Sequence, residues 1–154
     1  DEDDTLIWVG HSRGVLLALK ALDLDPFHRQ QALTIGVGFG WPPEETTHIF
    51  ETPFYKSTLN IRRQLVSEAL KPDNVFPWIK EEKKHLQVHN KRIHLICGED
   101  DVIVGKEGAE KLAEHLENIG NEVSVEKPKR LPHHQPDMAA AHVKKFIKDR
   151  GLFA

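Results

Sequence analysis

A serine between two glycines is the part of this sequence best suited to nucleophilic chemistry. Residues 10–14 read Gly-His-Ser-Arg-Gly, after the apolar run of residues 5–9 and before an apolar helical pattern. Because a serine hydroxyl is a weak nucleophile near neutral pH, it must be held beside a general base and a site for a developing oxyanion. A sharp strand-to-helix turn would expose Ser12 at its apex. Because such a turn is cramped, we expect its two flanking positions to require small residues, a requirement that Gly10 and Gly14 meet.

A general base and an orienting acid can be placed after two later strands. The apolar run of residues 92–97 leads into Gly98-Glu99-Asp100-Asp101, and the run of residues 122–126 leads into Leu131-Pro132-His133-His134. Parallel strands bring their carboxyl ends to one edge of a sheet, so a carboxylate and a histidine can meet Ser12 there. The chain order is serine, acid, histidine, which suits a triad built on such a turn. His11, next to the serine, is expected to pack beneath the turn or to hydrogen-bond backbone rather than to act as the base.

Four short apolar runs predict the strands that would position these residues. They cover residues 5–9, 32–39, 92–97 and 122–126, and all four have the composition of buried parallel strands. The helical pattern after Ser12 is apolar on almost all sides, which predicts a helix packed on both faces. Two further helices are expected, over residues 106–119 with a stop at Gly120, and from Pro136 with Met138, Ala141, Phe146 and Ile147 as its apolar stripe. Strand alternating with helix predicts an α/β fold with a mostly parallel sheet flanked by helices.

Residues 41–90 form a connection much longer than the 10 to 12 residues or so that a crossover needs. A helical pattern runs through Leu59, Ile61, Leu65, Val66 and Leu70, Lys71-Pro72-Asp73 interrupts it, and a more charged helix is expected over residues 77–89. We therefore predict one domain, residues 1–154, with a small helical insertion at about 41–90. The aromatic residues of this segment could line a substrate pocket; they are Trp41, Phe50, Phe54, Tyr55, Phe76 and Trp78.

Composition narrows the class of partner. The 154 residues carry 21 Lys and Arg against 24 Asp and Glu, a formal net charge of −3, without a basic run that could follow a phosphate backbone. A nucleic-acid partner is therefore not expected. No stretch approaches the roughly 18 consecutive apolar residues of a membrane-spanning helix, so we expect a soluble protein.

Two further patterns have ordinary structural explanations. The single cysteine, Cys97, lies in an apolar run, which predicts a buried thiol and fits a reducing compartment such as the cytoplasm. His85 and His89 stand four residues apart and could share a helical face, but no third metal ligand is evident. Because Glu81 and Lys84 lie close by, we expect a solvated face there and no metal site.

The motifs together resemble the C-terminal part of an α/β-hydrolase-fold protein. In that family the acid commonly stands three residues after a glycine that ends its strand, which matches Gly98 and Asp101, with Asp100 as the alternative. The family's first strands and the loop that donates one oxyanion hydrogen bond would precede the part of the fold that is matched here. The chain alone is therefore expected to be inactive.

The resemblance is less regular around the histidine. The family's histidine follows a glycine in a loop, several residues before a Pro-Glu pair that opens the last helix. Here Pro132-His133 and Pro136-Asp137 take those places, so both the glycine and the spacing differ. The resemblance implies His133 as the base, with His134 as the alternative, and the backbone N–H of Arg13 as an oxyanion donor.

The resemblance implies a serine hydrolase, above all a carboxylic-ester hydrolase that acts on a small apolar ester through an acyl-enzyme. It implies no metal, nucleotide or organic cofactor, and it implies that the insertion forms a cap over the site. Amidases, thioesterases and carbon–carbon hydrolases share this machinery and remain alternatives. A binding protein or receptor of the same fold is another, and the altered histidine loop favours it.

Overall fold

The computed structural model describes residues 6–24, 27, 31–41 and 52–152 of the chain. Contacts divide it into two compact units, one formed by Asp1–Pro42 with Gln87–Ala154 and the other by Pro43–Leu86. The predicted aromatic residue Phe50 and the first residue of the first predicted strand, Thr5, lie outside the described residues. All candidate site residues belong to the first unit.

Four parallel strands form the sheet of the first unit, in the order β1-β2-β3-β4. They are β1 (Leu6–His11), β2 (Ala32–Val37), β3 (Arg92–Ile96) and β4 (Glu122–Glu126). The register places Gly10 beside Gly36 and Ile93 beside Val123. The predicted parallel α/β sheet is confirmed, and every strand end that the prediction missed differs by no more than two residues.

The strands differ in burial according to their place in the sheet. The central strand β2 is buried at all six positions, whereas β1 and β4 are mostly half-buried. Val9 of β1 keeps 55% of its surface exposed. The prediction of four buried strands is therefore wrong for these two, because an outer strand of the sheet has a neighbouring strand on one side only.

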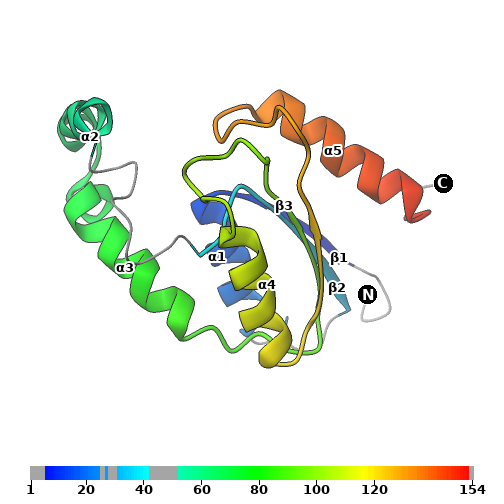
Figure 1. The fold of residues 1–154 in the computed structure, drawn as a ribbon. Coiled ribbons are helices and arrows are strands. Elements are labelled where there is room, and N and C mark those ends of the chain that lie inside the picture. The colour runs from blue at the N-terminus through cyan, green and yellow to red at the C-terminus, as the bar shows by residue number, and fades with distance from the viewer. Residues whose placement is uncertain (1–5, 25–26, 28–30, 42–51, 153–154) are drawn as a thin grey trace. The chain divides into compact units, whose positions relative to one another are not determined.

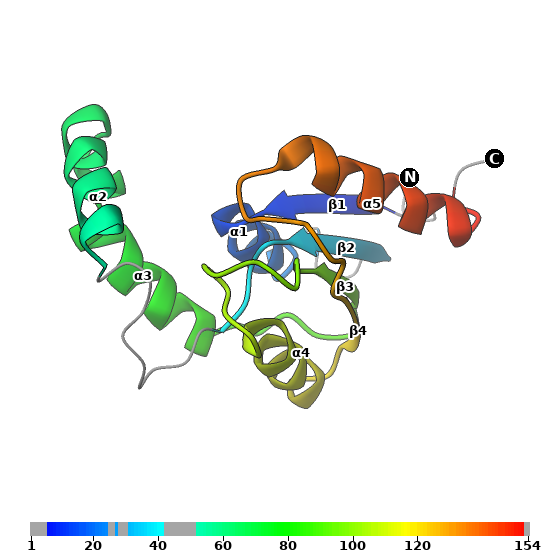
Figure 2. The same cartoon turned by 45° about the horizontal axis from the view of Figure 1, so that its top comes forward.

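Helices cover both faces of this sheet (Figures 1 and 2). On one face lie α1 (Arg13–Ala21), which contacts β1 and β2, and α4 (Gly108–Asn118), which contacts β3 and β4. On the other face lies α5 (Pro136–Asp149), whose Ala139 and Ile147 pack with Leu33, Ile35 and Val37 of β2. Helix α1 connects β1 to β2 and α4 connects β3 to β4, and all three neighbouring strand pairs are parallel.

Helix α1 packs on one side only, contrary to the prediction. Val15, Leu16 and Leu19 are fully buried against the sheet, but Leu17 is 51% exposed. A helix on the face of a sheet buries the stripe that meets the strands and leaves the opposite side to solvent. The apolar pattern of this helix is thus wider than the surface it covers.

The later helices begin and end close to the predicted positions. Gly120 follows α4 with φ 106°, a left-handed conformation that suits glycine at a helix end. Helix α5 starts at Pro136, as predicted, and its buried residues include Ile147. Met138 of the predicted apolar stripe is 41% exposed, because neighbouring Ala139 faces the core instead.

The second unit is helical. It contains α2 (Pro53–Leu65), a 3-10 turn η3 (Glu68–Leu70) and α3 (Pro72–Lys84). The predicted continuation of the first helix to Leu70 is wrong, because Val66 adopts extended backbone angles that end α2. The second helix begins at Pro72, where proline is tolerated in the first turn, rather than at residue 77. The Arg63–Asp73 ion pair, at 2.7 Å, joins α2 to α3.

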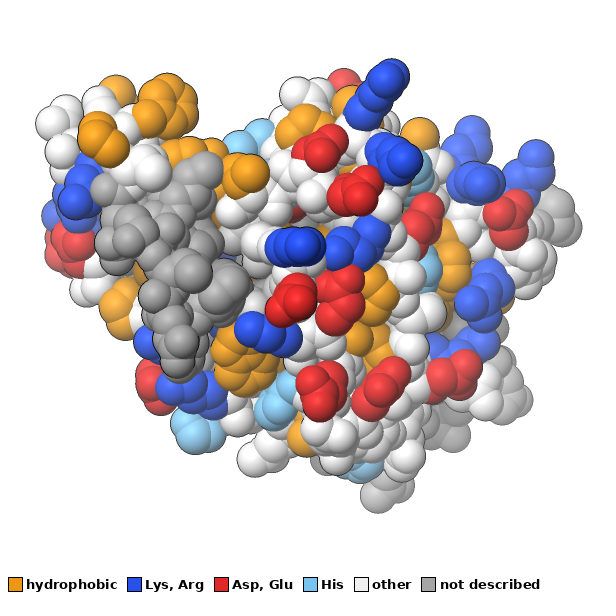
Figure 3. Space-filling view, viewed as in Figure 1, with side chains coloured by type: hydrophobic (Ala, Val, Ile, Leu, Met, Phe, Trp, Pro, Cys, Tyr) orange, Lys and Arg blue, Asp and Glu red, His pale blue; other side chains and the backbone are white. Residues whose placement is uncertain are grey.

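Charged side chains of both signs are interspersed over the face that carries α4 (Figure 3). Lys127, just after β4, makes a 2.8 Å ion pair with Glu110 of α4. Within the described ranges, no helix is both long and apolar enough to cross a membrane.

A buried histidine links the sheet to α5. The ring of His94 in β3 stacks on Phe146 at 3.7 Å between centroids and contacts Ser124 at 2.6 Å and Glu126 at 3.2 Å. Burial lowers the pKa of His94, an effect to which the charge of Arg150 adds and which Glu126 opposes in part. The neutral imidazole is therefore the form that the fold favours.

This lowered pKa predicts acid sensitivity. In the unfolded chain His94 takes up a proton near its ordinary pKa of about 6.5, before the folded chain does. The stability that His94 contributes is complete above that pH and is lost as the pH falls toward the lower folded pKa. We expect His94→Gln to flatten the fall in unfolding free energy between pH 7 and 5, measured by urea titration, relative to a His85→Gln control at an exposed site. Equal slopes in wild type and His94→Gln would contradict this assignment.

Candidate active site

Ser12 stands at a strained turn between β1 and α1. Its backbone angles are φ 53° and ψ −123°, a region that non-glycine residues rarely occupy. The Ser12 N–H donates to the carbonyl of Val37 at 2.7 Å, and its own carbonyl accepts from the N–H of Val15 at 3.0 Å. The turn is therefore fixed to β2 and to the helix that follows, and Ser12 lies at its apex.

Of the two flanking glycines, one meets the prediction and one does not. A Cβ on Gly10 would lie 2.8 Å from backbone atoms of Gly14 and Val15, so this position must be small. A Cβ on Gly14 would meet no atom within 4 Å. The prediction that Gly14 must be small is therefore wrong in this structure, because the crowding arises on the strand side of the turn.

Three of the predicted residues form a continuous hydrogen-bonded chain. Ser12 Oγ lies 3.0 Å from His133 Nε2, and His133 Nδ1 lies 2.9 Å from Asp101 Oδ2. The side chains of His133 and Asp101 are only 7% and 2% exposed. A carboxylate only accepts, so Nδ1 carries the proton of a neutral ring and Nε2 accepts from the serine hydroxyl. Each residue follows the carboxyl end of its strand: β1, β3 or β4.

The loop after β3 separates the two candidate acids. Asp101 is buried, and its other oxygen, Oδ1, accepts from the backbone N–H groups of Ile103 at 3.0 Å and Val104 at 3.2 Å. Asp100 is exposed, and its carboxylate accepts instead from the N–H of Arg130 at 3.1 Å. The structure thus brings Asp101 to the histidine and places Asp100 as a link to the histidine loop.

The two candidate histidines also differ in their contacts and in their exposure to solvent. His134 is exposed, and its ring meets the ring of His133 edge-on with centroids 4.7 Å apart. His133 is the residue that contacts both Ser12 and Asp101. His11 hydrogen-bonds the backbone carbonyl of His133 at 2.9 Å through Nε2, which confirms the expectation that it bonds backbone.

The altered histidine loop is held close to the acid loop. A Cβ on Gly98 would lie 1.7 Å from the carbonyl oxygen of Leu131, so only glycine permits this approach. The Glu99 N–H also donates to the carbonyl of Pro128 at 2.9 Å. These contacts bring the two loops together although the loop lacks the glycine before its histidine.

Gly38, which follows β2, is a site residue that the sequence reasoning missed. It has φ 66°, and a Cβ there would lie 3.3 Å from His133 Nδ1 and 3.5 Å from Asp101 Oδ2. The alternation Gly36-Val37-Gly38 at a strand end was the available signal. Gly38 leaves room for the hydrogen bond between His133 and Asp101.

We expect Gly38→Ala to impair both the fold and the site. Left-handed backbone is strained for alanine, and the new methyl group would press on the histidine–aspartate pair, so the unfolding free energy should fall by about 1–2 kcal/mol. The reactivity of Ser12 should fall by about tenfold or more. Gly14→Ala is the matched control, and because it sits in a helix with free space it should stabilise by about 0.5–1 kcal/mol. Urea titration measures the first effect; equal stability of both variants would contradict it.

One donor for an oxyanion is available beside the serine. Arg13 is the first residue of α1, so its backbone N–H has no acceptor within the helix. The positive end of the helix dipole adds to the attraction for negative charge at this point. The predicted role of the Arg13 amide thus has a suitable position, directly after Ser12.

The remaining candidate groups, Cys97 and the pair His85 and His89, lie in surroundings that explain them without a catalytic role. Cys97 is buried, its thiol donates to the carbonyl of Phe39 at 3.3 Å, and burial raises its pKa to about 11. A thiol with this pKa is not a nucleophile at neutral pH. Helix α3 ends at Lys84, so His85 and His89 do not share a helical face. Among the described residues, no group of three or more His, Cys, Asp or Glu side chains is arranged to hold a metal ion.

The chain resembles known proteins in its structure. No protein-family model and no curated protein matches the chain. The solved structures that resemble it include a monoacylglycerol lipase of Paleococcus ferrophilus, with a TM-score of 0.54, and a protein assigned as a non-heme bromoperoxidase of Mycobacterium tuberculosis, with a TM-score of 0.53.

The extent of the likeness bears on the fold alone. Each structure is 14% identical to the chain, and the matches cover 94% and 93% of this chain but 67% and 66% of those proteins. The chain thus spans about two thirds of their length. With a four-stranded parallel sheet between α1 and α4 on one face and α5 on the other, the chain has a partial α/β-hydrolase fold.

Proposed function

We propose that this chain carries the triad of a serine hydrolase that cleaves carboxylic esters through an acyl-enzyme. The observation that supports it most is the continuous chain from Ser12 Oγ through His133 to Asp101, with distances of 3.0 and 2.9 Å. A serine used only for structure needs no buried histidine on its hydroxyl, and that histidine needs no buried carboxylate behind it. The strained backbone of Ser12 supports the same reading.

In the proposed reaction, His133 Nε2 removes the hydroxyl proton as Ser12 Oγ attacks the ester carbonyl. Asp101 holds the ring in the required tautomer and stabilises the positive imidazolium. The Arg13 N–H would donate to the developing oxyanion. His133 then protonates the departing alcohol, and a water molecule activated by the same histidine releases the acid.

The structural comparison gives secondary support for an ester as substrate. One of the similar structures is a monoacylglycerol lipase. The triad geometry by itself suits any acyl transfer to serine. The proposal of an ester is therefore a separate claim, that the leaving group is an alcohol rather than an amine or a thiol. A panel of esters, amides and thioesters with one common acyl group would compare the leaving groups directly.

A fluorophosphonate probe tests the nucleophile. Applied to the full-length polypeptide, it should label wild type and fail to label Ser12→Ala. Ser57→Ala, at an exposed position of α2, is the matched control and should label like wild type. If wild type were unlabelled, or if Ser12→Ala were labelled at the wild-type rate, the proposed function would be wrong.

We also propose that the second unit contributes to the choice of substrate. Apolar side chains of this unit are unusually exposed, including Phe54 at 72% and Leu65 at 79%, and they stand eleven positions apart, on one face of α2. Phe54→Ser with Leu65→Ser should raise KM for long-chain p-nitrophenyl esters by about 30-fold or more, because each of the two lost apolar contacts weakens binding by about 1 kcal/mol or more. The KM for the acetate ester should change little; an equal change for both esters would contradict a selective role.

A further inference from the structure

We propose that His11 is a positioning residue that holds the main chain of the base, His133, in place. The inference rests on the proposed function, since it assigns a task to a neighbour of the nucleophile. The nucleophile turn would then contact the base twice. Ser12 meets its ring, and His11 meets its backbone.

The direction of the His11 hydrogen bond is fixed by chemistry. Its partner, the carbonyl oxygen of His133, can only accept, so His11 Nε2 carries a hydrogen and donates across 2.9 Å. The two rings lie 5.4 Å apart between centroids and are tilted by 41°. This contact therefore joins two segments that are 122 positions apart in the sequence.

The rest of the histidine loop is anchored on either side of His133. Upstream, the Arg130 N–H donates to Asp100, and downstream the Ala139 N–H donates to the carbonyl of Gln135 at 3.0 Å. Among the described residues, no other hydrogen bond reaches the main chain of His133. His11 thus holds the main-chain carbonyl of His133, and the position of this main chain determines where the His133 ring can lie.

The ring of His133 has little tolerance for movement. It must keep Nδ1 on Asp101 at 2.9 Å and Nε2 on Ser12 at 3.0 Å together. A shift of the main chain lengthens one bond or the other, and a misplacement of about 1 Å can cost on the order of 100-fold in rate. A clamp on the main chain of His133 therefore supports both bonds.

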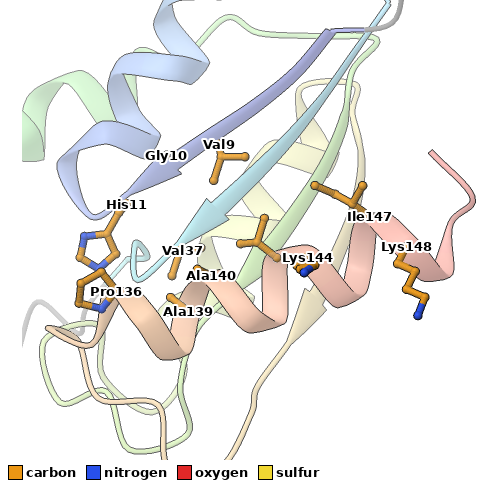
Figure 4. A pocket seen from close by; sticks show the side chains of 11 residues that line it. Val9, Gly10, His11, Val37, Pro136, Ala139, Ala140, Lys144, Ile147 and Lys148 are labelled. Carbon is orange, nitrogen blue, oxygen red and sulfur yellow. The ribbon is translucent and has the colours of Figure 1, made fainter. Parts of the chain in front are cut away.

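Packing is the competing explanation for His11. Its side chain stands at one end of an apolar groove of about 610 Å³ between β1 and α5, together with Pro136 (Figure 4). The groove is otherwise lined mainly by aliphatic residues such as Val37 and Ala139. If volume were all that mattered, leucine would replace His11 well. If the hydrogen bond matters, only a side chain that donates an N–H will do.

The test uses His11→Leu and His11→Gln in the full-length polypeptide, with fluorophosphonate inactivation of Ser12 as the readout. Leucine fills the space without a donor, and glutamine carries an N–H donor at similar reach. We expect kinact to fall by about 10- to 100-fold in His11→Leu, with KI within about twofold of wild type, and to stay within about threefold in His11→Gln. Wild-type kinact in His11→Leu, or equal losses in both variants, would overturn the inference.

A second readout does not depend on reactivity at Ser12. In ring-labelled protein, exchange of the His133 Nδ1 proton with solvent reports how firmly the ring stays on Asp101. We expect exchange to be about tenfold faster in His11→Leu and unchanged in His11→Gln. If fluorophosphonate failed to react with wild type, the proposed function would be wrong, but the proton exchange would still test the role of His11. Equal exchange rates in wild type and His11→Leu would refute that role.

Discussion

His133→Ala is expected to lower the rate of Ser12 acylation by about 10⁴-fold or more, while His134→Ala stays within about threefold of wild type. Without the imidazole, the serine hydroxyl has no acceptor for its proton, since His133 is the group 3.0 Å from Ser12 Oγ. His134 contacts the edge of the His133 ring and is exposed to solvent. Its removal should disturb the base only slightly.

The rates would be measured as the burst of p-nitrophenol from an activated ester. Thermal unfolding of each variant shows whether the fold is intact, and His134→Ala serves as the matched control at the adjacent position. The opposite pattern, with a large loss in His134→Ala and a small one in His133→Ala, would move the base to His134. Equal small losses would remove histidine from the reaction.

Asp101→Asn is expected to lower the acylation rate by about 10³- to 10⁴-fold with little loss of stability. The amide oxygen of asparagine can still accept from the Ile103 and Val104 N–H groups, which now bond Asp101 Oδ1. The amide nitrogen would then face His133 Nδ1 in place of Oδ2. It donates and cannot accept, so the ring would shift its proton to Nε2 and lose its capacity as base.

Asp100→Asn is the control for this substitution. Asparagine can still accept from the Arg130 N–H, and Asp100 does not contact the histidine ring, so the rate should change by less than about threefold. Pre-steady-state bursts measure the rates, and urea titration measures the stabilities. A loss of rate in Asp101→Asn that merely follows a loss of folded protein would contradict the assigned role, as would equal losses in the two variants.

The sequence was sufficient for the four strands and for the turn that carries Ser12, the proposed nucleophile. Ser12 lies between a strand and a helix that their own apolar periodicity predicts, and Gly10 marks the cramped side of the turn. The parallel direction of the strands follows from alternation with helices, because each crossover returns the chain to the edge from which the preceding strand started. The site follows from this topology, since Ser12, Asp101 and His133 all come after strand ends.

The sequence could not choose between adjacent candidates. Asp100 and Asp101 have the same chemistry, and what separates them is a tight turn in which two backbone N–H groups donate to Asp101 Oδ1. His133 and His134 are separated by contacts between distant segments, since the ring of His133 meets Ser12 and Asp101 whereas His134 is exposed. Such contacts depend on the packed fold and leave no local pattern.

Two other differences between the predictions and the structure also arise from contacts in the packed fold. Gly38 has no functional group, so its importance appears only when the His133 ring is seen within 3.3 Å of the place a Cβ would occupy. The periodicity of α1 predicted burial on both sides, yet Leu17 is exposed, because periodicity reports which residues are apolar and not how many neighbours the helix has.

The most direct measurement of the central claim is the mass of the acyl-enzyme. The full-length polypeptide would be mixed with a p-nitrophenyl ester, quenched in acid within milliseconds, digested and examined by mass spectrometry. We expect one acyl group, on the peptide that contains Ser12, and its accumulation should disappear in Ser12→Ala and in His133→Ala. An acyl group on another residue, or ester hydrolysis with Ser12 replaced, would contradict the claim.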